Sequence, residues 1–261
     1  MLALPDPGFP GGLTMFSIFI RCTALWLGLL LAVPAQAGIV LNTTRVIYQA
    51  QDKEVSLAVH NSGSGEILAQ SWLQAEDEKV DPADLPFAIT PALARMTGNA
   101  RQMIRIIYAG EGLPTDRESV FWLNVQEIPQ TARENELQIA IRQRIKLFFR
   151  PQGMSGDPLK AAQALQWRVQ GGQLEVSNRS PYHVSLIQLE ARQQGKPLFS
   201  ADSQMLAPLQ SLKLPLRAAT PGKPVELRFI SINDFGAQEA YLAQVVADRT
   251  VQAERTDVRT D

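Results

Sequence analysis

The strongest constraint on the fold is a series of short runs, beginning after Gly38, in which apolar and polar residues alternate. Examples of these runs are KEVSLAVHNSG, RQMIRIIYAG, SVFWLNVQEI and VELRFISIND, and clusters of Gly, Asn, Pro or Asp separate them. A period of two, bounded by turn residues, is typical of β-strands with one buried face. We therefore predict an all-β fold.

The predicted strands fall into two blocks on either side of the Pro- and Gly-rich segment RPQGMSGDPLK. Each block has the size of an immunoglobulin-like β-sandwich domain, which is roughly 100 residues. We expect these two domains at residues 38–152 and 159–250, a linker at 153–158 and a flexible tail at 251–261. The stretch 82–96 contains several prolines, and it is predicted to be a loop with one turn of helix.

The N-terminal residues 1–37 have a different character. From Met15 on, Arg21 precedes a short apolar core that ends in the small-residue triplet Ala-Gln-Ala, which indicates a secretory signal peptide cleaved after Ala37. Residues 1–14 carry no Lys or Arg, so we expect translation to start at Met15. A membrane anchor is the alternative, but the arginine leaves too short an apolar run to span about 30 Å of hydrocarbon.

Composition argues against several classes of function. The formal net charge is -1, so nothing suggests a nucleic-acid partner. The single cysteine, Cys22, would leave with the signal peptide, and the two histidines, His60 and His183, lie in different predicted domains, where a structural or surface role is expected. No phosphate-binding glycine loop is present. We expect no metal, no cofactor, no small-molecule substrate and no enzymatic activity.

The segment LQIAIRQRIKLFFRP, residues 137–151, places cations in the most hydrophobic part of the chain. Strand alternation puts the cations Lys146 and Arg150 on one face. The opposite face carries the apolar residues Leu137, Ile139 and Ile141. Buried charges are costly unless they are paired, so a negative partner is expected. Two alternatives stay open: an exposed edge that a partner covers, or a long core strand whose cations reach solvent.

Five motifs, in order, resemble the periplasmic pilus chaperones of the chaperone-usher pathway. They are LNTTRVIY, DRESVFWLNVQEIP, LQIAIRQRIKLFFRP, NRSPYHVSL and FISINDFGA. The resemblance implies two immunoglobulin-like domains in an L or boomerang arrangement, a location in the periplasm, and two partners, pilin subunits and an outer-membrane usher. The chaperone lends the last strand of its first domain to a pilin sandwich that lacks one strand.

The resemblance also implies roles for individual residues. Leu137, Ile139 and Ile141 are the donor-strand residues that fill the gap in the pilin. Arg45 and Lys146 hold the carboxylate at the pilin C-terminus. The same resemblance assigns an interdomain salt bridge to Glu118, Arg150 and Asp234, and the short loop PQTARENE resembles the short-loop branch of the family.

Two alternative functions explain less of the sequence. A secreted two-domain adhesion or scaffolding module, with no chaperone activity, explains the signal peptide and the strands but not the pair formed by Arg45 and Lys146. A periplasmic hydrolase on a β scaffold needs a nucleophile and a base, and the sequence indicates neither.

Overall fold

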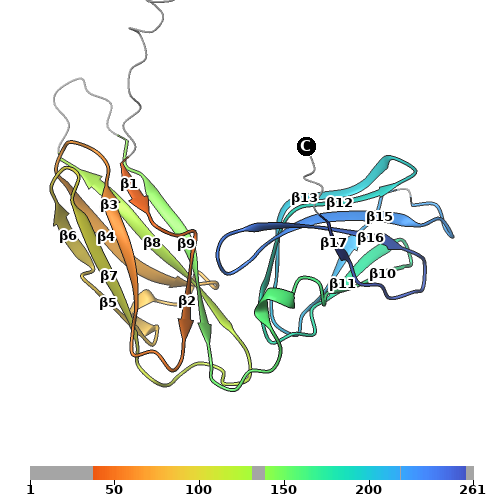
Figure 1. Ribbon diagram of the computed structural model, residues 1–261, viewed down its shortest axis with the longest axis horizontal. Coiled ribbons are helices and arrows are strands. Elements are labelled where there is room, and N and C mark those ends of the chain that lie inside the picture. Colours follow the sequence, from red (N-terminus) through yellow and green to blue (C-terminus); the bar gives the residue numbers. More distant parts are fainter. Residues whose placement is uncertain (1–37, 131–138, 218, 257–261) are drawn as a thin grey trace, which may run out of the picture. The chain divides into compact units, whose positions relative to one another are not determined.

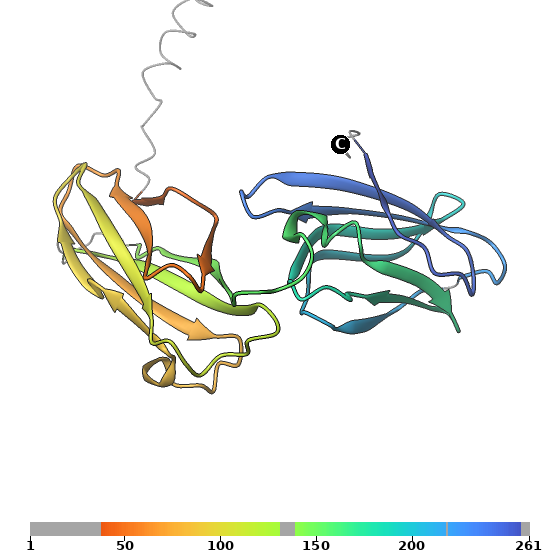
Figure 2. The ribbon, with the colours of Figure 1, turned by 60° about the horizontal axis from the view of Figure 1, so that its bottom comes forward.

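A computed structural model describes residues 38–130, 139–217 and 219–256, and this part of the chain confirms the predicted all-β fold. It consists of strands and two short 3-10 helices, η1 (Pro82–Asp84) and η2 (Pro158–Lys160). Figures 1 and 2 show from two directions that strands β1 to β9 build one sandwich and strands β10 to β17 another. Within the described part, no helix has the length and apolar character needed to cross a membrane.

The first sandwich packs a four-stranded sheet, in the order β1-β3-β7-β5, on a five-stranded sheet, in the order β2-β9-β8-β4-β6. Its strands are β1 (Ile39–Leu41), β2 (Arg45–Gln49), β3 (Val55–Asn61), β4 (Ile67–Ala75), β5 (Phe87–Thr90), β6 (Leu93–Met96), β7 (Arg101–Tyr108), β8 (Ser119–Pro129) and β9 (Arg142–Arg150). Most neighbours are antiparallel, but β2 and β9 are parallel.

Alternating side chains fill the core of this sandwich. Leu57 on β3 and Ile106 on β7 are at most 1 % exposed, whereas their strand neighbours reach intermediate or exposed positions, and Leu147 on β9 is 0 % exposed. Aromatic rings add edge contacts, with Phe87 and Phe121 at 5.0 Å between centroids. Burial of each large apolar side chain contributes about 1.5–3 kcal/mol, so the period-two pattern is what fixes the register of the sheets.

The second sandwich packs a three-stranded sheet, β10-β11-β14, on a five-stranded sheet, β13-β12-β15-β16-β17. Its strands are β10 (Gln166–Gln170), β11 (Gln173–Ser177), β12 (Val184–Gln193), β13 (Lys196–Leu206), β14 (Ser211–Pro215), β15 (Val225–Ile232), β16 (Gln238–Val245) and β17 (Glu254–Thr256). Trp167 is fully buried at its centre, with its ring 5.3 Å from that of Phe229.

The structure corrects two details of the sequence prediction. The predicted loop at 82–96 contains a 3-10 turn but also the strands β5 and β6, which pair with β7 and β4. The predicted flexible tail is ordered in its first part, because β17 pairs with β16 and Ala253 is 1 % exposed in the second core. Prolines concealed the first feature and polar composition concealed the second, since sheet pairing satisfies the backbone whatever the side chains are.

Candidate functional site

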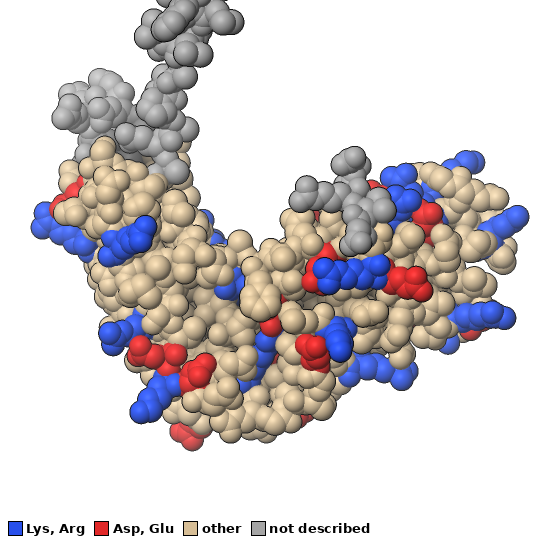
Figure 3. All heavy atoms as spheres, viewed as in Figure 1, with Lys and Arg blue, Asp and Glu red and all other residues tan. Residues whose placement is uncertain are grey.

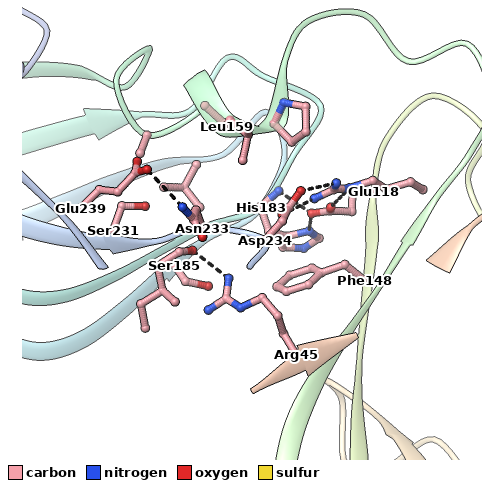
Figure 4. A pocket seen from close by; sticks show the side chains of 16 residues that line it. Arg45, Glu118, Phe148, Leu159, His183, Ser185, Ser231, Asn233, Asp234 and Glu239 are labelled. Atoms are coloured by element: carbon pink, nitrogen blue, oxygen red, sulfur yellow. Dashed lines mark hydrogen bonds and ion pairs between the residues drawn. The ribbon is translucent and has the colours of Figure 1, made fainter. Parts of the chain in front are cut away.

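Arg45 and Lys146 lie side by side on neighbouring strands. In the parallel ladder between β2 and β9 they are register partners, so their side chains leave the same face of the sheet. Both side chains reach the second sandwich: Arg45 donates a hydrogen bond from a terminal nitrogen to the carbonyl of Ile232 at 2.7 Å, and Lys146 Nζ donates to Ser185 Oγ at 3.0 Å. Figure 4 shows the Arg45 guanidinium pointing toward these strands.

These two cations are only partly satisfied. Among the residues that the structure describes, no carboxylate forms an ion pair with either side chain, and the buried Nε of Arg45 has no hydrogen-bond partner. Burial lowers the pKa of Lys146 to about 8, and the neighbouring charge of Arg45 contributes to the same shift. Burial also lowers the pKa of Arg45, although Asp234 and Glu118 act in the opposite direction. An anion placed here would relieve both shifts.

Four residues further along β9, Arg150 is fully paired. Its Nε donates to Glu118 Oε1 at 2.7 Å, and its two terminal nitrogens donate to the two oxygens of Asp234 at 2.6 and 2.7 Å. The Arg150 side chain is 7 % exposed and that of Glu118 is 1 % exposed. Burial alone would lower the pKa of Arg150, but the bonds and charges of Asp234 and Glu118 raise it. The cluster links β8 and β9 to the turn after β15.

His183, which immediately precedes β12 in the second sandwich, belongs to the same cluster. Both its backbone nitrogen and its Nδ1 lie within hydrogen-bond distance of Glu118 Oε2, at 2.7 and 2.8 Å. The carboxylate of Glu118 therefore joins Arg150 of one sandwich to His183 of the other, and Figure 4 shows Glu118 beside His183. Sequence reasoning missed His183, because the contact spans 65 residues along the chain and no local spacing signals it.

The space between these groups is small. Arg45, Glu118, Arg150 and Asp234 are among the residues that line a cavity of about 20 Å³, which has room for roughly one water molecule. A metabolite does not fit such a cavity. The arrangement can hold a small charged group that enters from its edge, such as one carboxylate, but it offers no enclosed substrate pocket.

The predicted donor-strand residues lie before β9. Ile139 and Ile141 are 68 % and 44 % exposed, and Leu137 lies outside the described residues. The strand itself begins at Arg142, so it is shorter than the sequence predicted. Nevertheless the pairing with β8 continues beyond it, because the backbone nitrogen of Glu127 donates to the carbonyl of Ile141 at 2.9 Å. Two large apolar side chains next to the start of β9 are thus exposed to solvent.

Charged residues of both signs are dispersed over the face of the molecule drawn in Figure 3, where Lys and Arg lie among Asp and Glu. On this face no broad cationic surface of the kind that tracks a nucleic-acid backbone is seen.

Comparison with known protein families gives matches to both sandwiches. Residues 38–155 match the family described as "Pili and flagellar-assembly chaperone, PapD N-terminal domain", and residues 160–243 match "Pili assembly chaperone PapD, C-terminal domain". Together these matches span most of the described chain.

Individual proteins are similar as well. The chain is 42 % identical over 226 residues to the chaperone protein FimB/FhaD of Bordetella pertussis, covering 82 % of this chain and 91 % of that protein. A crystal structure of the YadV chaperone is 37 % identical, with a TM-score of 0.68 and coverage of 80 % of this chain and all of the other. The SafB chaperone, solved with the Salmonella enterica SafA pilin, is 28 % identical with a TM-score of 0.66, covering 82 % of this chain and 98 % of that one.

Proposed function

This chain belongs to the family of pili and flagellar-assembly chaperones, and from that membership we propose that it is a periplasmic chaperone that folds and caps pilin subunits and delivers them to an outer-membrane usher. The observation that carries the proposal is the pair of half-satisfied cations, Arg45 and Lys146, at the end of an open strand edge. The remaining features of the site follow from what these cations and that edge can bind.

The open edge belongs to the first half of β9. On one side β9 pairs with β8 from Arg142 onward, but on the other side β2 pairs only from Lys146 to Arg150. Within the described ranges no strand pairs with the remaining side of residues 142–145. A strand that filled this gap would form backbone hydrogen bonds along the free edge, which is how strand addition gains affinity without depending on sequence.

The same geometry fixes the direction of the added strand. Its C-terminal carboxylate has to reach Arg45 and Lys146, and its preceding residues have to run back along Ile141 and Ile139. The added strand is therefore parallel to β9, and it continues the line of β2. Anchoring one end also sets the register, since a slip of one residue would turn every side chain to the opposite face.

Apolar burial supplies the remaining affinity. Ile139 and Ile141 are exposed in the free protein, and we propose that they, with Leu137, enter the groove of a pilin sandwich that lacks its last strand. Each side chain contributes up to about 1.5–3 kcal/mol when it is fully buried. Exposed apolar side chains on an open edge favour aggregation unless a partner covers them, and the pilin is that partner.

The cluster of Glu118, Arg150 and Asp234, extended by His183, has a structural role in this proposal. It joins charged groups of the two sandwiches through bonds of 2.6 to 2.8 Å. We propose that the cluster keeps Ser185 and Ile232 of the second sandwich opposite Lys146 and Arg45, so that the carboxylate site is formed before the pilin arrives.

Several finer assignments belong to the same proposal. The signal peptide is cleaved after Ala37, and the domains correspond to residues 38–152 and 159–250, the second extended by β17. The protein is not an enzyme and takes no cofactor. It belongs to the short-loop branch, an assignment that depends on the loop at 129–136, most of which lies outside the described residues. An adhesion module would have no use for the two unpaired cations.

The direct test is co-expression with a pilin-like subunit in the periplasm, followed by recovery of the complex. Wild-type protein is expected to protect the subunit from proteolysis, and Lys146→Ala and Arg45→Ala are expected to lose that protection while remaining folded. Full protection by both variants would contradict the proposal.

A further inference from the structure

A stripe of cations and tryptophans runs along the outward face of strands β4, β8 and β9. The guanidinium carbon of Arg144 lies 4.3 Å from the ring centre of Trp122, and that of Arg142 lies 6.0 Å from the ring centre of Trp72. Lys146 Nζ lies 5.6 Å from the same Trp122 ring. Each cation is placed over an aromatic face, which attracts a positive charge even at an exposed site.

The two arginines of this stripe are exposed, and no described carboxylate forms an ion pair with them. Three arginines on other strands, Arg95, Arg192 and Arg228, each lie within 2.9 Å of a glutamate. Stacking on tryptophan holds the guanidinium groups of the stripe in place and leaves their N–H edges free. Such preorganised groups lose little entropy when they bind a carboxylate.

The open edge of β9 places the stripe beside the strand that would be added there. Residues that are level with each other in neighbouring parallel strands point to the same face of the sheet. The added side chains level with Arg142 and Arg144 therefore lie on the outward face, two residues apart, while the residues between them face the apolar groove with Ile141. Cross-strand pairs of opposite charge at such positions stabilise the pairing of the two strands.

We infer that Arg142 and Arg144 select pilin subunits whose last strand carries acidic side chains at alternate, outward-facing positions just before the C-terminus. This inference rests on the proposed function, because it requires the added strand, and it assigns a preference in partner sequence beyond the carboxylate anchor. Apolar residues of the pilin strand would fill the groove, whereas the acidic residues would decide which subunits bind more tightly.

The test uses synthetic peptides with apolar residues at alternate positions, Ser and Thr between them, and a free C-terminal carboxylate. The two polar positions nearest the C-terminus are both Glu, both Gln or both Lys. With wild-type protein we expect the Glu peptide to bind about fivefold more tightly than the Gln peptide, and the Lys peptide about fivefold more weakly. These differences should vanish near 1 M salt, where exposed charges are screened beyond about 3 Å.

The double variant R142Q/R144Q should bind all three peptides within about twofold of one another. The matched control is Arg101→Gln on β7, an exposed arginine in the other sheet of the same sandwich, which should keep the wild-type preference. The inference is wrong if the Glu and Lys peptides bind wild-type protein equally well, or if R142Q/R144Q keeps the preference for Glu. In either case the proposed function still stands if Lys146→Ala weakens binding of the Gln peptide. Failure of every peptide to bind wild-type protein overturns the proposed function with it.

Discussion

Two of the cations on strand β9, Lys146 and Arg150, lie four residues apart and have opposite surroundings. Arg150 is bonded to two carboxylates, and these bonds raise its pKa. Lys146, on the same face, has the neutral hydroxyl of Ser185 as its hydrogen-bond partner, and burial lowers its pKa to about 8. Arg150 has its counter-ions within the protein, whereas no carboxylate of the described residues forms an ion pair with Lys146.

The difference separates stability from binding. A buried ion pair that loses one partner leaves the other charge uncompensated, so the Arg150 cluster is needed for the folded state. A buried cation with no counter-ion lowers the stability of the folded protein, so we expect Lys146 to contribute to ligand binding and not to stability. Mutation of Arg150 should therefore lower stability, whereas mutation of Lys146 should weaken binding.

The largest effect is expected for Arg150→Ala. This change leaves Glu118 buried beside His183 without its cation, which should lower the free energy of unfolding by about 3–5 kcal/mol. Urea denaturation followed by tryptophan fluorescence measures this loss, and Lys146→Ala is the matched control, with no comparable loss expected. A destabilisation of Arg150→Ala below about 1 kcal/mol, which is the range of exposed pairs, would remove the contrast between the two cations.

The second effect concerns Lys146→Ala in binding. Charge-assisted hydrogen bonds to a carboxylate are worth about 1.5–3 kcal/mol, so affinity for a peptide with a free C-terminus should fall about 10- to 100-fold. Isothermal titration calorimetry with the free and the C-terminally amidated peptide, each on wild-type protein and on Lys146→Ala, completes a double-mutant cycle. Amidation should weaken binding to wild-type protein and have little further effect in the variant; equal losses in both proteins would show that Lys146 does not meet the carboxylate.

A smaller effect is expected when Ile139 is replaced by Ser. The side chain is 68 % exposed in the free protein, so the variant should fold normally, while its affinity for the peptide falls roughly tenfold because apolar burial is lost on binding. Ile107→Ser on β7, another exposed isoleucine, is the control and should bind as wild type does. The prediction is wrong if both variants bind equally well.

The smallest effect is a dependence on pH. The protonated form of Lys146 binds a carboxylate, and bound carboxylate raises its pKa, so affinity should be constant below about pH 8 and fall above it, roughly fourfold between pH 7 and 8.5. Stability of the free protein has the opposite sign: the cost of the buried charge is full below the folded pKa of about 8 and is relieved as pH rises toward the ordinary value of 10.5. Lys146→Arg should abolish both trends, and a fall in affinity that persists in this variant would assign the titration to another group.

The sequence was a good guide wherever one face of a strand is buried. Apolar and less apolar residues alternate in the sequences of β7 and β15, because about every second side chain of these strands is buried. Alternation failed at β5 and β6, since prolines at 82, 86 and 91 conceal two short strands whose pairing is supplied by β7 and β4. The length of β9 was overestimated because hydrogen-bond partners, and not alternation, decide where a strand begins.

Site residues could be found only through the ordered motifs. By composition alone Glu118 is an ordinary surface acid, yet it is 2 % exposed and holds both Arg150 and His183. Such contacts join residues 32 and 65 positions apart, and no local period encodes them. The pairing of Arg45 with Lys146 likewise arises from the parallel register of β2 and β9, which requires the folded sheet.

The short strand β17 has a consequence for solubility. Without it, β16 would be the outermost strand of its sheet, and its free backbone groups at Ala240, Tyr241 and Leu242 would be a template for another chain. Three residues of β17 occupy that template, and Ala253 is buried just before them. In the second sandwich the three-residue strand β17 covers the edge of β16, whereas in the first no described strand covers the open edge of residues 142–145 of β9. A protein truncated before Val251 would expose the edge of β16 in addition to that of β9, and it is expected to associate with itself through the exposed edge of β16.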